Sequence, residues 1–203
     1  MSINPRLLKL FWAKTQPDLI LAAYNTCFIP LKIKTIATLV CFDNYMSFFS
    51  ITTHQKLPIT LAEAWDFFSS PKNLKTITPA YMGFEITSND VQETMYAGQI
   101  ITYKVKPLLG IPMSWMTEIS HVEYQKYFVD EQRFGPYALW HHKHFFKTIP
   151  GGVEIIDKVD YKLPLGILGS LANTVFVRKK LQSIFDYRSK KLNELFGEYK
   201  TIV

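Results

Sequence analysis

The sequence has few cysteines, no long apolar run and no clear secretory signal. Cys27 and Cys41 form neither a C-x-x-C pair nor a spaced metal box, so we expect no disulfide framework and no zinc knuckle. The best membrane candidate, residues 19–31, contains Asn25 and Pro30 and falls short of the roughly 18 apolar residues that a spanning helix needs. We therefore expect a cytoplasmic protein in a reducing compartment, with no stable membrane insertion.

Common catalytic motifs are also missing. The chain contains no G-x-S-x-G elbow, no phosphate-binding glycine loop, no H-E-x-x-H and no dinucleotide fingerprint. These absences remove the usual grounds for proposing an enzyme, and we expect no cofactor.

The net charge of +6 does not indicate a nucleic-acid binder. Such a protein concentrates its cations on one face. The densest basic cluster here, Arg178 to Lys180, alternates with apolar residues at helical spacing, which is typical of the exposed side of an amphipathic helix. An interaction module that uses this basic helix stays open as one functional option.

The pattern of the chain changes near Met46. Before it, apolar residues keep neither a helical nor a strand period, and three prolines interrupt the runs. Residues 1–45 are therefore either a peripheral extension or an upstream stretch that the native protein lacks because translation begins at Met46. We favour the second interpretation, and we expect one domain over residues 46–203. The full sequence is 48% apolar and is long enough for one domain with a sizeable core.

The helix-start and turn signals after Met46 predict an α+β architecture. Thr60-Leu-Ala-Glu63 is a capping box that begins one short helix, and Pro71 suits the first position of a second. Short connections such as Pro150-Gly151-Gly152 predict antiparallel hairpins. The expected strands are residues 48–57, 84–88, 99–107, 113–124, 127–134, 137–148 and 153–163.

The last expected strand shows the clearest strand period of apolar residues, and the segment after it shows the clearest helical period. Residues 153–163 alternate between apolar and polar, which predicts a sheet with one buried and one wet face. From Leu168 to Leu195 apolar residues recur at helical spacing, and Gly197 suits a helix C-cap. We expect one long helix of roughly 30 residues here, with a separate turn near Gly166–Gly169.

Residues 135–146 form the most unusual stretch. In a strand, Lys143 would mark one face as exposed. The opposite face would then point inward and carry two aromatic rings and two imidazoles: Trp140, His142, His144 and Phe146.

Two buried imidazoles need partners, because an unsatisfied polar group in an apolar interior is costly. Asp157 lies in the adjoining hairpin strand and is the only carboxylate in its inward row. This group is compatible with a structural polar cluster that fixes strand register, with a ligand-orienting group, or with an acid–base pair. A metal site would take His142, His144 and either Asp157 or His121; spacing positions no further ligand, so we expect none.

Neighbouring strands add further residues that line a cavity or simply fill the core. Trp115, Thr117 and Ile119 share one row, and Phe128, Asp130 and Gln132 share another whose orientation is less clear. A largely apolar pocket with a few convergent polar groups is typical of small-molecule binding. Our candidate ligand-binding residues are Trp115, Thr117, Gln132, Tyr137, Trp140, His142, His144, Phe146, Asp157 and Tyr161.

Several of these residues also carry a resemblance to a known family. The run from Phe128 to Gln132, then 135–146, Asp157 to Pro164 and the late segment 184–188 resemble an uncharacterised bacterial branch of the START-like (SRPBCC) superfamily. The resemblance spans roughly residues 48–197. It implies a helix-grip fold, in which a curved antiparallel sheet of six to seven strands wraps around a long C-terminal helix over a deep cavity.

The wider superfamily includes lipid and sterol carriers and polyketide cyclases, but the fold alone does not fix a function. Our leading hypothesis is non-catalytic binding or carriage of a hydrophobic small molecule, such as a lipid, an isoprenoid or a polyketide-like ring. The alternative is a cyclase- or dehydratase-like enzyme that uses a pocket histidine as general acid or base. The sequence does not give the oligomeric state.

Overall fold

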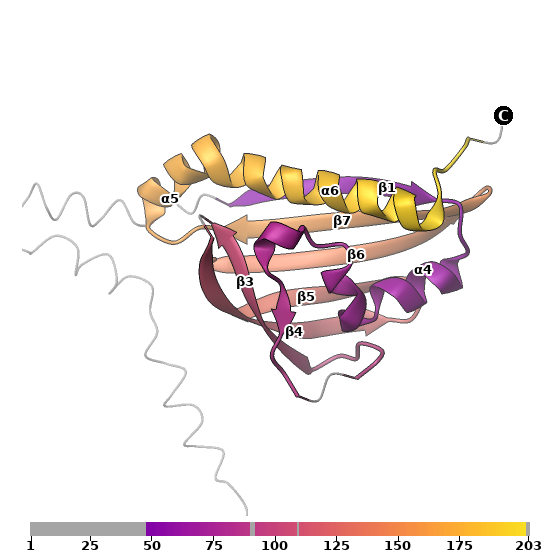
Figure 1. Cartoon of the computed structure of the whole chain (residues 1–203), viewed down its shortest axis with the longest axis horizontal. Helices are drawn as coiled ribbons and strands as arrows, with labels where there is room; N and C mark the ends of the chain where they lie inside the picture. Colours follow the sequence, from indigo (N-terminus) through magenta and orange to yellow (C-terminus); the bar gives the residue numbers. More distant parts are fainter. Residues whose placement is uncertain (1–47, 90–91, 109, 202–203) are drawn as a thin grey trace, which may run out of the picture. The chain divides into compact units, whose positions relative to one another are not determined.

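A computed structural model describes residues 48–89, 92–108 and 110–201. The two cysteines and Met46 lie outside the described residues. In the described part, a seven-stranded antiparallel sheet is combined with short helices after the first strand and a long helical segment at the C-terminus (Figure 1). The predicted helix-grip fold is confirmed. No helix among these residues is long and apolar enough to span a membrane.

The chain enters the sheet through β1 (Phe49–Leu57) and leaves it at once for helices. The predicted capping box is present at the start of α4 (Leu61–Phe68), because Glu63 N–H donates to Thr60 Oγ1 and Thr60 N–H donates to the Glu63 carboxylate. The second short helix, η2 (Pro71–Lys75), is a 3₁₀ helix with Pro71 at its first position. A further 3₁₀ turn, η3 (Ala80–Met82), was not predicted.

The six remaining strands form a meander, and β1 is the edge strand that pairs with the last strand of that meander. The strand order is β1-β7-β6-β5-β4-β3-β2, and every pair is antiparallel. This order makes β5, β6 and β7 neighbours, with β5 at the centre of the sheet and β7 next to the edge strand β1. The strands are β2 (Glu85–Ile86), β3 (Gln99–Leu108), β4 (Ile111–Glu123), β5 (Tyr127–Phe134), β6 (Leu139–Ile149) and β7 (Gly152–Lys162).

Two strand boundaries differ from the sequence prediction for identifiable reasons. β2 is shorter than residues 84–88. It begins after Phe84, which packs into an apolar cluster with Val105 and Trp115, and it ends where the N–H groups of Thr87 and Ser88 both donate to the carbonyl of Thr102. β6 begins after Tyr137, because the backbone of Tyr137 is bonded in both directions to the side chain of Gln132. These bonds hold Tyr137 in the connection between β5 and β6.

The predicted alternation in β7 is confirmed. The five side chains on its inward face, from Val153 to Tyr161, are all buried. They pack beneath α4 at one end, where Trp65 meets the rings of Phe128 and Phe146 edge-on. Burial of such large rings supplies much of the driving force that holds helix and sheet together.

The C-terminal helical segment is longer than one regular helix. It consists of α5 (Gly166–Ala172), a π-helical turn η4 (Asn173–Val177) and α6 (Arg178–Phe196), with Gly197 at the C-cap as predicted. The predicted continuous helix is therefore interrupted. Within the interruption Asn173 is buried, and its Oδ1 accepts a hydrogen bond of 2.6 Å from the Tyr161 hydroxyl of β7. π-helical turns of this kind commonly accommodate one extra residue in an α-helix.

Candidate functional site

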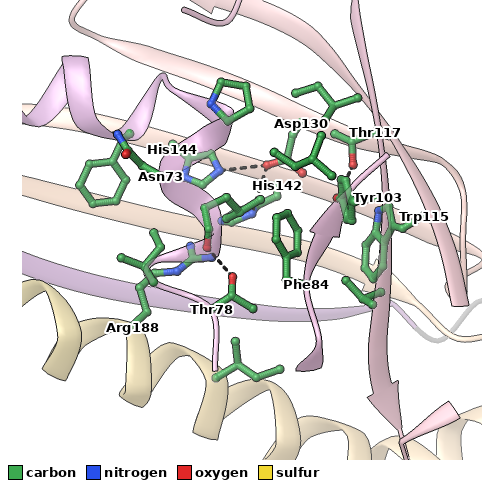
Figure 2. Close-up of a pocket in the computed structure, with 18 of the residues that line it drawn as sticks. Asn73, Thr78, Phe84, Tyr103, Trp115, Thr117, Asp130, His142, His144 and Arg188 are labelled. Atoms are coloured by element: carbon green, nitrogen blue, oxygen red, sulfur yellow. Dashed lines mark hydrogen bonds and ion pairs between the residues drawn. The ribbon is translucent and has the colours of Figure 1, made fainter. Parts of the chain in front are cut away.

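A cavity lies between the sheet, α6 and the short helices that follow α4. Its volume is about 160 Å³, it is partly open, and its wall is mainly apolar. Figure 2 shows the lining side chains that come from η2, the central strands and α6. A cavity of this size resembles the engineered cavity of about 150 Å³ that holds benzene, and it is smaller than typical pockets for drug-sized ligands, about 300–1,000 Å³.

A closed group of two histidines and two aspartates lies at the polar part of the wall, with three of its members lining the cavity and the second aspartate behind the imidazoles. We call Asp130, His142, His144 and Asp157 the His–Asp cluster. Strand register creates it, because Asp130 of β5 is paired with His142 of β6, and Asp157 of β7 is paired with His144. Side chains of paired residues point to the same face of a sheet, so all four converge.

Each imidazole in the cluster lies between both carboxylates. His142 Nε2 is hydrogen-bonded to Asp157 Oδ1 at 3.1 Å, and His144 Nε2 to Asp130 Oδ2 at 2.9 Å (Figure 2 draws the second). Two further ion-pair contacts close the ring: His142 Nδ1 to Asp130 Oδ2 at 3.3 Å, and His144 Nδ1 to Asp157 Oδ1 at 2.6 Å. All four ring nitrogens therefore lie within 3.3 Å of a carboxylate oxygen, but the contact of His144 Nδ1 lacks hydrogen-bond geometry, so this nitrogen has no hydrogen-bond partner in the described part of the chain.

Opposite charges dominate the protonation of this buried cluster. Burial by itself lowers the pKa of His142, but the Asp130 and Asp157 carboxylates outweigh it and raise this pKa to about 9. Burial raises the pKa of each aspartate, and the histidines reverse that effect, so both pKa values lie below the ordinary range. At neutral pH both aspartates are ionised and His142 is a cation.

The part of the wall next to the cluster is aromatic, because the Trp140 ring lies edge-on to His142 with the ring centroids 6.0 Å apart. Trp115 packs edge-on against Trp140, with ring centroids 5.4 Å apart, and Tyr103 stacks on Trp115 at 6.0 Å. The Tyr103 hydroxyl is hydrogen-bonded to Thr117 at 2.6 Å (Figure 2), and burial raises the pKa of Tyr103 above its usual range. Tyr103 therefore stays neutral where it lines the cavity.

The α6 side of the cavity carries a positive charge, Arg188. Among the residues that the structure describes, Arg188 is the only lysine or arginine that lines the cavity. Its guanidinium lies 5.2 Å from the ring centroid of Phe185, and its Nε is buried with no hydrogen-bond partner in the described part of the chain. From the sequence, Arg188 belongs to the segment 184–188 that carries the family resemblance and to the cations expected on the exposed side of the C-terminal helix, so the sequence did not indicate a role in the cavity.

The ten candidate ligand-binding residues fall into two groups. Six line the cavity: Trp115, Thr117, Tyr137, Trp140, His142 and His144. Four lie outside its wall: Gln132, Phe146, Asp157 and Tyr161. Of these, Asp157 lies behind the imidazoles, and Phe146 packs against α4. Gln132 binds the backbone of Tyr137, and Tyr161 binds Asn173.

The structure also supplies wall residues that the candidate set lacked. Asp130, named above only as a residue of unclear orientation, points into the cavity. Phe84, Leu181, Phe185 and Arg188 reach it from segments distant in sequence. No local pattern identifies these residues, since their common environment arises only when the helical segments cover the sheet.

The cluster also contains the one group of potential metal ligands found among the described residues. Oxygen and nitrogen atoms of Asp130, His142 and His144 lie within 4.8 Å of one another, with Asp157 behind the histidines. The third member of this group is therefore Asp130, and not Asp157 or His121 as expected from the sequence; His121 is exposed elsewhere on β4. Metal binding requires neutral imidazoles, whereas the carboxylates favour a protonated His142. Protons compete strongly with a metal here.

Comparisons with known proteins agree on the fold. No family model matches the chain, and no curated protein matches it. Solved structures do match: Ms6760 from Mycobacterium smegmatis has 14% identity and a TM-score of 0.53, covering 72% of this chain and 92% of that one. TTHA0849 from Thermus thermophilus has 17% identity, a TM-score of 0.54, and coverage of 71% and 94%. Major latex-like protein 151 from Panax ginseng has 12% identity, a TM-score of 0.55, and coverage of 73% and 97%. At these identities the likeness shows the fold.

Proposed function

We propose that this helix-grip domain binds a small, largely apolar molecule that carries an acidic group, and that it does so without catalysing a reaction. The apolar body of the ligand would contact the aromatic wall around Trp115 and Trp140, and its acidic end would pair with Arg188. The main support is the buried Nε of Arg188, which has no hydrogen-bond partner in the described part of the chain and lies at a cavity whose wall is mainly apolar.

An unpaired buried donor is costly, because it has lost water without gaining a partner. The His–Asp cluster cannot relieve this cost, since its carboxylates already pair with the two imidazoles. A ligand carboxylate, sulfonate or phosphate would satisfy Arg188 through charge-assisted hydrogen bonds. The cavity of about 160 Å³ holds a single ring, so a longer ligand such as a lipid would extend through the open side.

The closed cluster also argues against the enzymatic alternative. A general base needs an unprotonated nitrogen within reach of the proton that it removes. Here every ring nitrogen of His142 and His144 faces a carboxylate, and His142 is protonated at neutral pH. The arrangement suits a fixed polar wall that orients a ligand better than it suits proton abstraction.

A matched pair of ligands tests the proposal. Isothermal titration calorimetry with 3-phenylpropionic acid and 3-phenylpropan-1-ol compares an acid and an alcohol on the same apolar body. We expect the full chain to bind the acid about tenfold or more tightly, which corresponds to the 1.5–3 kcal/mol typical of hydrogen bonds to charged groups. In Arg188→Met this preference should disappear while the alcohol binds as before.

Lys190→Met is the matched control, because Lys190 is an exposed cation on the same helix and does not line the cavity. It should leave both affinities unchanged. Failure of both compounds to bind, with no retained ligand in native mass spectra of protein purified from its host, would refute small-molecule binding. Equal binding of acid and alcohol, unaffected by Arg188→Met, would refute only the proposal that the ligand carries an acidic group.

A further inference from the structure

The start of the C-terminal helical segment exposes an unusual amount of apolar surface. We call Leu165, Ile167, Leu168, Leu171 and Val175 the α5 patch. Their exposed fractions are 76%, 52%, 67%, 58% and 71%. Single exposed apolar residues are ordinary, whereas a contiguous group of this kind marks an interaction site. Figure 1 shows α5 at one end of the long helical segment, away from α4.

The orientation of this patch is fixed by packing on the opposite side of the segment. Gly169 and Asn173 are buried, and Asn173 is hydrogen-bonded to Tyr161. A Cβ built on Gly169 would lie 2.2 Å from the Pro164 carbonyl oxygen, so the helix approaches the preceding chain as closely as glycine permits. The polar side chain of Asn173 faces the sheet and the apolar side of the segment faces outward. An ordinary surface helix has the reverse arrangement.

Positive charge borders the patch. Arg178 and Lys179 are exposed at the start of α6. Residues 161–185 contain four basic residues and no aspartate or glutamate. An exposed apolar helix face beside a group of cations is the arrangement that binds the interface of a membrane with anionic lipids. A protein partner would need a complementary acidic rim, whereas an anionic bilayer offers both the apolar depth and the charge.

We propose that the α5 patch docks on the surface of a membrane that contains anionic lipids. The apolar side chains would enter the boundary between headgroups and acyl chains, while Arg178 and Lys179 would pair with lipid phosphates. The domain would lie on the bilayer without crossing it.

The α5 patch lies in a segment that leads to the cavity wall, so membrane docking would bring the bilayer near the ligand-binding space. Lys180 Nζ is 3.8 Å from the ring centroid of Tyr81, so the start of α6 lies beside η3. The next residue in each segment, Leu181 and Met82, lines the cavity. A bilayer held against α5 would therefore be near one wall of the ligand-binding space.

Vesicle flotation with the full chain tests this inference. Vesicles of phosphatidylcholine alone are compared with vesicles that contain phosphatidylglycerol. We expect binding to the anionic vesicles, weakened by added salt, with a loss of about fivefold for each of Arg178→Gln and Lys179→Gln. The double variant Leu171→Asp/Val175→Asp should reduce binding about tenfold or more, because it places charge in the apolar face.

Tyr124→Asp/Phe134→Asp is the matched control, since both residues are exposed apolar side chains outside the α5 patch. It should keep vesicle binding, and unchanged circular dichroism spectra should show that both double variants are folded. Absence of binding to anionic vesicles would overturn the inference. A change of oligomeric state in Leu171→Asp/Val175→Asp without any vesicle binding would also overturn it, by assigning the patch to a second copy of the chain. Ligand binding in the cavity is measured separately and is independent of either outcome.

Discussion

His142 and His144 lie with their ring centroids 3.8 Å apart and with both rings held between the same two carboxylates. Adjacent inward positions on β6 place the rings together, and cross-strand pairing on both sides places Asp130 and Asp157 at their edges. Two imidazoles so close would repel each other when both are charged. The two carboxylates make the arrangement stable, and this leads to the first prediction.

Removal of one carboxylate should destabilise the domain strongly. Asp157→Asn leaves two buried imidazoles with half of their counter-charge, and breaking a buried ion pair typically costs about 3–5 kcal/mol. We expect a loss of this order in the free energy of unfolding, measured by urea denaturation. Asp160→Asn on the same strand should cost much less, because Asp160 is on the wet face. Equal effects of the two substitutions would contradict the proposed role of the cluster.

Stability should fall on the alkaline side of neutrality. The pKa of His142 is raised from 6.5 to about 9 in the folded state, so its contribution is complete below about pH 6.5 and lost as pH rises through 9. The lowered pKa values of Asp130 and Asp157 give a contribution present above their ordinary value of 3.8 and lost as pH falls below it. Thermal unfolding should show a plateau between these limits.

The matched variants for this pH profile are His142→Gln and His121→Gln. The first should lose the decline in Tm between pH 6.5 and 9, whereas the second should retain it because His121 is exposed. A decline of the same size in His142→Gln would assign it to another group.

Filling the cavity should abolish ligand binding without unfolding the protein. Ile184 lines the cavity from α6 and is only half-buried, so Ile184→Trp can occupy the space with little backbone strain. We expect calorimetry with 3-phenylpropionic acid to show at least a tenfold loss of affinity, roughly 1.4 kcal/mol. Gln182→Trp, on the exposed side of the same helix, should bind normally. Unchanged affinity in Ile184→Trp would place the ligand elsewhere.

Gly169→Ala should destabilise the domain although alanine normally favours helices. In an exposed helix the change gains about 1 kcal/mol, but here the new Cβ would meet the Pro164 carbonyl oxygen at 2.2 Å. We expect a lower Tm and weaker protection of α5 amides in hydrogen exchange. Ser183→Ala, at an exposed helical position, should leave both unchanged. A more stable Gly169→Ala would show that α5 is not held closely against residues 163–164.

Much of the architecture follows from local patterns. The capping box at Thr60 and Glu63 is satisfied within four residues, so it could be read directly from the sequence. The alternation in β7 is equally local, because each step along a strand reverses the side-chain direction. The π-helical turn was not predicted, since the apolar period of the segment does not indicate it, and the hydrogen bond of Asn173 within it goes to Tyr161 of β7, outside the helical segment.

The candidate site could be predicted only in part. The inward face of β6 was correct, because Lys143 marks the other face as exposed and leaves Trp140, His142 and His144 on the buried one. The second carboxylate, Asp130, was ambiguous, since Val129 beside it is also buried and the strand shows no clean alternation. Its position became fixed only through pairing with His142.

The sequence by itself determined where helices and strands form and which face of the central strands is buried, because those properties depend on neighbouring side chains and on the period of each element. Tertiary structure decided which groups meet. Arg188 on α6, Asp130 on β5 and the outward orientation of the α5 patch acquire their roles from contacts between distant segments. No periodicity encodes such contacts, since they depend on how the helical segments pack across the sheet.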